Sequence, residues 1–129
     1  MSDNLLLDTC ALIWLATGSR KLSADAKKRI NAAPQVFVSA ITAWEISLKS
    51  ERGDLTLPEE MEQWFPKVLL QHDLVLADLT PEILIAANRL PWHHRDPADR
   101  FILATAQLRR LTIVTGDKRF KAYAIPVVG

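Results

Sequence analysis

The chain has 129 residues, 49% of them apolar, which is the composition of one packed globular domain over residues 1–129 and excludes an intrinsically disordered protein. The formal net charge is only +1, so the chain lacks the basic surplus that would by itself indicate a nucleic-acid-binding protein. The single cysteine excludes an internal disulfide, and no stretch is typical of a membrane span or a secretory signal, so we expect a cytoplasmic protein with no membrane contact.

The first third of the chain alternates short apolar strands with helices. The apolar run at residues 5–7 predicts a buried strand, and Thr9 is placed to cap the helix that follows. Ser23 is placed to cap a second helix, and the β-branched and aromatic residues 35–38 predict the next strand. Ser39 is then placed to cap a third helix.

The rest of the chain continues the alternation. Apolar residues recur at helical spacing from 59 to 71, where Pro66 should kink the helix or split it in two. Helices are also predicted after Thr80 and after Asp96, each opening with a proline. Three further strands are predicted, at residues 74–79, 111–115 and 125–128. We therefore expect an α/β fold: a three-layer α/β/α sandwich with a central, mostly parallel sheet of about five strands.

Charge is unevenly distributed along the chain. Residues 1–92 hold nine Lys/Arg and twelve Asp/Glu, whereas residues 93–129 hold seven Lys/Arg and three Asp. This basic end is either an ordinary solvated surface or a surface that holds a phosphodiester backbone. The candidates for RNA binding are Arg95, Arg100, Lys118 and Arg119.

Four acidic residues stand just past an apolar stretch or in the first turns of the helix that follows it: Asp8, Glu45, Asp99 and Asp117. In an open parallel sheet these places all face one rim. Carboxylates gathered there repel one another unless a cation lies between them, and hard oxygen ligands suit Mg²⁺ or Mn²⁺. The pattern predicts metal-dependent phosphate chemistry.

Each of these carboxylates also has an ordinary structural explanation. Asp8 and Asp117 can cap the helices that follow them, and Asp99 can stabilise a helix N-terminus. Glu45 can pair with Lys49 one turn along its helix. One shared cation site is the more economical explanation, because it accounts for all four residues together.

Other conspicuous residues have simpler interpretations. Asp96, followed by Pro97, is typical of a helix N-cap. We expect the adjacent His93 and His94 to be solvated in a loop. We expect the core to contain Cys10, Trp14, Trp44 and Trp64.

The segments LLLDTCAL at residues 5–12, VSAITAWEI at 38–46, HHRDPADRFILA at 93–104 and VTGD at 114–117 resemble the four successive motifs of PIN domains. Their order, spacing and total length resemble the single-domain VapC-type toxins of bacterial toxin–antitoxin modules. Ala98 is smaller than the bulky apolar residue expected inside the third motif.

The resemblance implies a metal-dependent endoribonuclease whose acidic quartet, matched by Asp8, Glu45, Asp99 and Asp117, holds one or two Mg²⁺ or Mn²⁺ ions. Thr9 and Ser39 match small hydroxyl residues near that site. Asp96 matches the Asp that opens the third-motif helix, with a structural or supporting role. The family also implies a homodimer and a partner antitoxin that blocks the cleft.

Two hypotheses of different classes follow. In the first, the protein hydrolyses RNA at the acidic quartet. In the second, it is a catalytically silent module on the same fold that binds RNA or protein. A third, a small phosphohydrolase with an aspartyl nucleophile, is weaker, because no second Asp stands two residues after Asp8.

Overall fold

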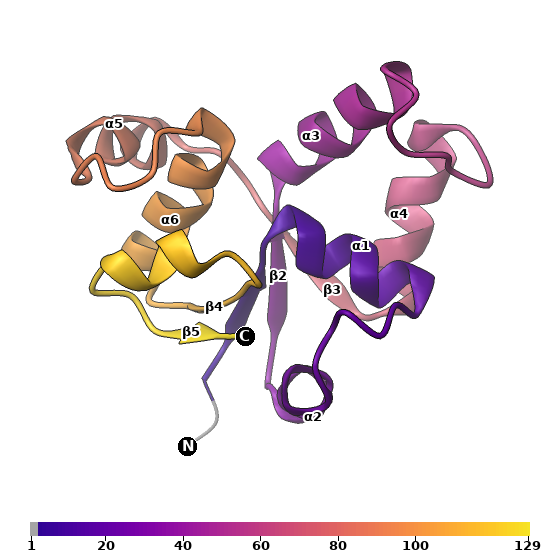
Figure 1. The fold of residues 1–129 in the computed structure, drawn as a ribbon, viewed down its shortest axis with the longest axis horizontal. Coiled ribbons are helices and arrows are strands. Elements are labelled where there is room, and N and C mark those ends of the chain that lie inside the picture. Colours follow the sequence, from indigo (N-terminus) through magenta and orange to yellow (C-terminus); the bar gives the residue numbers. More distant parts are fainter. Residues whose placement is uncertain (1–2) are drawn as a thin grey trace.

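The computed structural model describes residues 3–129 and contains a five-stranded, fully parallel sheet (Figure 1). The strands are β1 (Leu5–Leu7), β2 (Val36–Ser39), β3 (Leu74–Ala77), β4 (Thr112–Val114) and β5 (Val127–Val128), in the order β3-β2-β1-β4-β5. The predicted fold class and strand number are confirmed.

Three strands are shorter than predicted, since β4 also spans only Thr112–Val114. β3 ends at Ala77, opposite Ser39, because β2 ends there and gives way to a helix. β5 begins only after Pro126, since proline has no N–H to donate to a ladder, although its carbonyl accepts from the N–H of Ile113.

Helices cover both faces of the sheet. On one face lie α1 (Thr9–Thr17), α2 (Ala24–Ala32) and α4 (Met61–Gln71), and on the other lie α5 (Pro81–Arg89), α6 (Pro97–Arg109) and the short 3₁₀ helix η1 (Lys118–Ala122) (Figure 1). In β1, Leu5 and Leu7 pack into the first core while Leu6 packs into the second, because successive strand side chains point to opposite faces.

Helix α3 (Ala40–Glu51) contributes to both cores, with Ile46 buried in the first and Ile41 packed against the second. The prediction that Trp44 belongs to the core is wrong: its side chain is 58% exposed. Trp64, by contrast, is buried in α4 as predicted.

Two local predictions about helices also differ from the structure. Asp8, not Thr9, is the N-cap of α1, since its side chain accepts a hydrogen bond from the backbone N–H of Ala11. Helix α4 is not split at Pro66, because buried Phe65 and Val68 anchor the helix on both sides of the proline.

The sheet topology creates one special edge. From β1 the chain passes to β2 and β3 on one side, and then returns to β4 and β5 on the other. Such a reversal leaves a crevice at the carboxyl ends of the central strands. The residues that follow β1, β2 and β4 therefore meet there. Within residues 3–129, no helix combines the length and apolarity needed to cross a bilayer.

Candidate active site

Asp8 occupies the crevice directly after β1, and both of its carboxylate oxygens are held. Oδ1 accepts from the backbone N–H of Ala11 at 2.8 Å, and Oδ2 accepts from the hydroxyl of Thr115 at 2.6 Å. Thr115 follows β4, the strand next to β1. The side chain is buried, and burial raises its pKa. Capping and functional roles are therefore compatible in this residue.

Glu45 reaches the same crevice from the second turn of α3. Its Oε1 accepts a hydrogen bond from the hydroxyl of Thr9, which also lies 3.1 Å from the hydroxyl of Thr42. A hydroxyl has one proton to donate, so the hydroxyl of Thr42 is left to donate to that of Thr9. Burial raises the pKa of the Glu45 carboxyl, with nearby Asp96 and Asp8 adding to the effect.

Asp99 stands in the first turn of α6, where Asp96 caps the helix as predicted by accepting from the N–H of Ala98 at 2.9 Å. Burial raises the pKa of Asp99 to about 7, and repulsion from Asp96, Glu45, Asp8 and Asp117 contributes in the same direction. Asp99 therefore retains its proton up to about neutral pH, because its negative charge would be buried among other negative charges.

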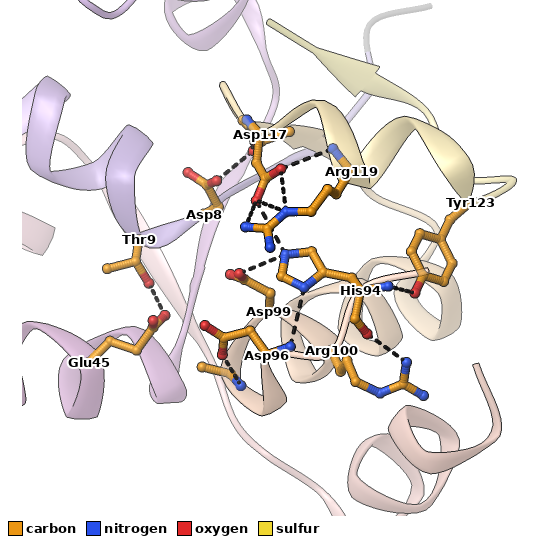
Figure 2. A network of polar contacts seen from close by, with 12 residues as sticks. Asp8, Thr9, Glu45, His94, Asp96, Asp99, Arg100, Asp117, Arg119 and Tyr123 are labelled. Atoms are coloured by element: carbon orange, nitrogen blue, oxygen red, sulfur yellow. Dashed lines mark hydrogen bonds and ion pairs between the residues drawn. The ribbon is translucent and has the colours of Figure 1, made fainter. Parts of the chain in front are cut away.

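His94 joins two of the acidic residues, as Figure 2 shows. Its Nε2 lies 2.9 Å from Oδ2 of Asp99 and 3.2 Å from Oδ2 of Asp117. Its Nδ1 accepts from the backbone N–H of Asp96 at 3.3 Å, so the neutral ring carries its proton on Nε2 and donates it to Asp117.

The prediction that His94 is solvated is wrong, because the residue is fully buried. Its backbone N–H donates to the hydroxyl of Tyr123 at 2.9 Å, and its ring meets the ring of Phe120 edge-on. These aromatic partners come from the end of the chain, so the sequence around His94 carried no signal of its burial.

Asp117 follows β4 and caps η1. Its Oδ1 accepts from the backbone N–H of Arg119 at 2.9 Å, and its Oδ2 accepts from Nη2 of Arg119 at 2.8 Å. These bonds from Arg119 lower the pKa of Asp117 to about 2, with a smaller contribution from His94. Thr115 also contributes here, since its Oγ1 accepts from the N–H of Asp117 at 3.0 Å while its hydroxyl donates to Asp8.

These groups line one cleft of about 410 Å³. Its walls are Asp8, Thr9, Cys10, Trp14, Glu45, Lys49, Asp96, Asp99, Gly116, Asp117 and Arg119. The structure thus brings together all four predicted carboxylates. Cys10 is exposed here rather than buried in the core. A Cβ at Gly116 would lie 2.8 Å from the ring of Trp14, so a larger residue there would have to displace the indole.

The donor set fits a divalent cation. Carboxylate oxygens are the ligands that Mg²⁺ and Mn²⁺ prefer, and the excess of negative charge that raises the pKa of Asp99 is what a bound cation would neutralise. The candidate ligand atoms of His94, Asp99 and Asp117 lie within 4.8 Å of one another. Because Nε2 of His94 carries a proton, the carboxylate oxygens are the better ligands.

The predicted basic residues separate into two groups. Arg119 lines the cleft, and Arg95 and Lys118 are exposed. The prediction that Arg100 binds RNA is wrong, because its side chain is 2% exposed and donates to the carbonyls of Ala87, Leu90, Pro91 and His94. Trp92 covers its guanidinium, which lies 3.5 Å from the centroid of the indole. Arg100 therefore organises the loop that carries His94.

Ser39 does not line the cleft. It is fully buried at the end of β2, and its hydroxyl accepts from the N–H of Ile41 at 3.2 Å to cap α3. Through that cap it fixes the start of the helix that carries Glu45.

The fold and the cleft define a class: an α/β protein with a carboxylate-lined site for a divalent cation at the switch point of a parallel sheet. The model of the PIN domain family matches residues 5–126, and the chain belongs to this family. It is 30% identical over 123 residues to ribonuclease VapC22 of Mycobacterium tuberculosis, an alignment that covers 95% of this chain and 93% of the relative.

Solved structures are similar over nearly the whole chain. A toxin–antitoxin complex from Klebsiella pneumoniae contains a chain that is 27% identical, with a TM-score of 0.68 and coverage of 97% of this chain and 96% of that one. A chain of the VapBC2 complex of Rickettsia felis, bound to a promoter DNA fragment, is 14% identical with a TM-score of 0.70 and coverage of 97% of both chains. This last likeness concerns the fold alone.

Proposed function

We propose that residues 1–129 form one PIN domain that acts as an endoribonuclease, using Mg²⁺ or Mn²⁺ held by Asp8, Glu45, Asp99 and Asp117. The observation that carries the proposal is the convergence of these four carboxylates in one cleft, where crowding helps to raise the pKa of Asp99 to about 7. A cation bound there would acidify a water and neutralise charge on the scissile phosphate.

The residues of the chain itself prepare the site. Thr115 and Thr9 donate to Asp8 and Glu45 and so fix the direction of two carboxylates. His94 donates to Asp117 and contacts Asp99 with the same ring nitrogen. Asp96 has a supporting role, since it caps α6 and its backbone N–H orients the His94 ring. Such preorganisation is how metal sites keep their ligands in place.

The remaining predicted basic residues hold the substrate in this proposal. Arg119 lines the cleft, and the exposed residues Arg95 and Lys118 are the sequence neighbours of Asp96 and Arg119, which both line it. Phosphates on either side of the scissile bond would bind to these cations.

We also propose that the protein is the toxin of a toxin–antitoxin pair. Support comes from its likeness to ribonuclease VapC22 and to the Klebsiella toxin–antitoxin complex. A cognate antitoxin would block the acidic cleft, and the toxin would form a homodimer. A toxin that cuts cellular RNA would act in the cytoplasm.

The test is an incubation of purified protein with end-labelled total cellular RNA, in Mn²⁺ or in excess EDTA. Asp8→Asn is the inactive variant, and Asp25→Asn is the matched control, because Asp25 is exposed in the first turn of α2. Fragments are expected from the wild type and Asp25→Asn in Mn²⁺ alone. If Asp8→Asn cuts as well as the wild type, the acidic cleft is not the active site. Tight RNA binding without any product would favour the silent binding module.

A further inference from the structure

A second hollow, of about 290 Å³, adjoins the acidic cleft between α3 and the start of α6. Its walls are Trp44, Glu45, Leu48, Lys49, Arg52, Asp54, Asp96, Pro97 and Ala98. Three of these, Glu45, Lys49 and Asp96, also line the acidic cleft. The two spaces are therefore continuous along one helix.

The spacing of residues along α3 explains why this one helix lines both the acidic cleft and the second hollow. Trp44, Leu48 and Arg52 follow one another at intervals of four residues and so form a stripe about 12 Å long. Glu45 and Lys49 are each one residue further along and form a neighbouring stripe that lines the acidic cleft as well.

The indole of Trp44 is available for a ligand. Its side chain is 58% exposed, and no aromatic or cation–π partner is found for it among residues 3–129. Trp92 is equally exposed, at 59%, but its ring is occupied by the guanidinium of Arg100.

The opposite wall is unusually small. Ala98 lies in the first turn of α6, at the position of the third motif where a bulky apolar side chain is expected. Its methyl group leaves space that a larger residue would fill.

Two cations, Lys49 and Arg52, line the hollow together with three acids, Glu45, Asp54 and Asp96. Lys49 and Arg52 form none of the ion pairs found within residues 3–129. The acids nearest the cleft have other roles, since Glu45 accepts from Thr9 and Asp96 caps α6. An aromatic platform beside free cations is the arrangement by which proteins bind single-stranded nucleic acid.

We propose that this hollow binds a nucleotide of the RNA that flanks the scissile phosphate, with its base stacked on Trp44 and its phosphate held by Lys49 and Arg52. The proposal rests on the proposed ribonuclease function, because continuity with the acidic cleft is what favours RNA over a protein partner. It makes Trp44 and Ala98 determinants of which nucleotide is accepted next to the cut.

The first experiment measures binding of a fluorescein-labelled, mixed-sequence single-stranded RNA by fluorescence anisotropy in EDTA, so that no cleavage intervenes. Trp44→Ala should weaken binding by roughly tenfold, whereas Trp44→Phe, which keeps an aromatic face, should stay within about threefold of the wild type. Leu70→Ala is the control, because Leu70 is an 85% exposed apolar residue of α4 that lines neither space. It should bind as the wild type does.

Two more variants test the other walls. Arg52→Gln should lower the slope of log affinity against log salt concentration by roughly 0.7, the value for one phosphate contact on a single strand. Ala98→Leu should fill the hollow and weaken binding while Trp44 remains in place. Thermal melts of every variant identify any that fail to fold, and Trp44→Phe and Arg52→Gln keep the test decisive if Ala98→Leu does not.

The second experiment maps the cut in total cellular RNA and uses a synthetic oligonucleotide spanning it as substrate in Mn²⁺. Trp44→Ala should raise KM and leave kcat within about twofold, because the base lies away from the scissile bond.

If the wild type binds RNA through Trp44 but never cuts, the ribonuclease proposal fails and the subsite stands. If Trp44→Ala binds and cuts as the wild type does, the subsite is refuted. A changed oligomeric state in light scattering with unchanged RNA binding would instead assign Trp44 to a protein interface.

Discussion

The two halves of the acidic cleft hold their carboxylates by different chemistry. On the α1 and α3 side, Asp8 and Glu45 accept only from neutral donors: threonine hydroxyls and one backbone N–H. On the α6 and η1 side, His94 donates to Asp117 and lies 2.9 Å from Oδ2 of Asp99, and the guanidinium of Arg119 pairs with Asp117 (Figure 2).

The difference appears in the pKa values of the carboxyl groups. Burial raises the pKa of Asp8 and Glu45, and their neutral donors offset this only in part. The pKa of Asp99 rises to about 7, while Arg119 lowers that of Asp117 to about 2. Neutral donors fix direction without cancelling charge, so most of the negative charge in the cleft is left for a cation to neutralise.

The largest effect is expected from removing one carboxylate in each half. Asp8→Asn and Asp99→Asn should each reduce metal-dependent RNA cleavage by roughly a hundredfold or more, because each removes a charge that the cation requires. Their effects on stability should differ. Asp99→Asn relieves repulsion and should raise the Tm measured in EDTA, which is the usual trade between stability and function.

Asp8→Asn should not raise the Tm. Both oxygens of Asp8 accept hydrogen bonds, and an amide nitrogen facing Thr115 would leave that hydroxyl without its acceptor. Differential scanning fluorimetry in EDTA checks both variants, with Asp25→Asn as the control. Equal rises in Tm for both would show that the two halves do not differ as described.

A smaller loss should follow from changing His94. His94→Leu removes the donor between Asp99 and Asp117 and should raise the Mn²⁺ concentration for half-maximal activity by roughly thirtyfold, within the range for residues that orient metal ligands. KM for RNA should not change, since the ring is fully buried. His94→Gln can still present an N–H near the position of Nε2 and should recover much of the loss. Equal impairment of Gln and Leu would show that the ring serves packing alone.

The four carboxylates could be predicted from the sequence because their positions follow from local rules. Asp8 and Asp117 come just after apolar strands, and Asp99 stands in the first turn after an Asp-Pro helix start. In a parallel sheet the carboxyl ends of the strands share one edge, so position along the chain translates directly into position in space. Glu45 needed only the additional rule that helical side chains lean toward the N-terminus.

The residues that orient those carboxylates could not be predicted in this way. His94 is buried by Tyr123 and Phe120, which are more than twenty residues away in sequence and arrive only through the tertiary fold. Arg100 looked like part of a basic surface. A signal existed in the helix phase, because neighbours on a helix point about 100° apart, so Arg100 cannot face the cleft that Asp99 faces.

The affinity for Mn²⁺ should change roughly tenfold per pH unit because of the titration of Asp99. With a pKa of about 7 in place of 3.8, the folded protein retains an extra proton between about pH 4 and 7. Its contribution to stability without metal is therefore greatest at the acid end of that range and is lost as the pH rises through about 7. A cation needs the deprotonated carboxylate, so Mn²⁺ affinity should rise by roughly tenfold per pH unit up to about pH 7 and then level off.

Isothermal titration calorimetry with Mn²⁺ measures this dependence from about pH 5.5 to about pH 8.5, a range that brackets the pKa of Asp99. Asp117→Asn is the informative comparison, because Asp117, with a pKa of about 2, is charged throughout and its loss should lower affinity without removing the slope. A flat profile for the wild type would mean that Asp99 is already ionised across the range.

The smallest effect is expected from Arg119, which is exposed and pairs with Asp117 at 2.8 Å. Exposed ion pairs contribute little to stability, so Arg119→Gln should leave the Tm nearly unchanged.

The two effects of Arg119→Gln on binding should have opposite signs. Without the guanidinium, the carboxylate of Asp117 is free for the cation, so Kd for Mn²⁺ should fall by roughly threefold. Without its positive charge, KM for RNA should rise by roughly threefold. Lys118→Gln, which removes a neighbouring exposed charge that forms no ion pair with Asp117, should raise KM and leave Mn²⁺ binding unchanged. If both variants change Mn²⁺ affinity equally, the effect comes from net charge, and the specific pairing of Arg119 with Asp117 does not set the charge of this half of the cleft.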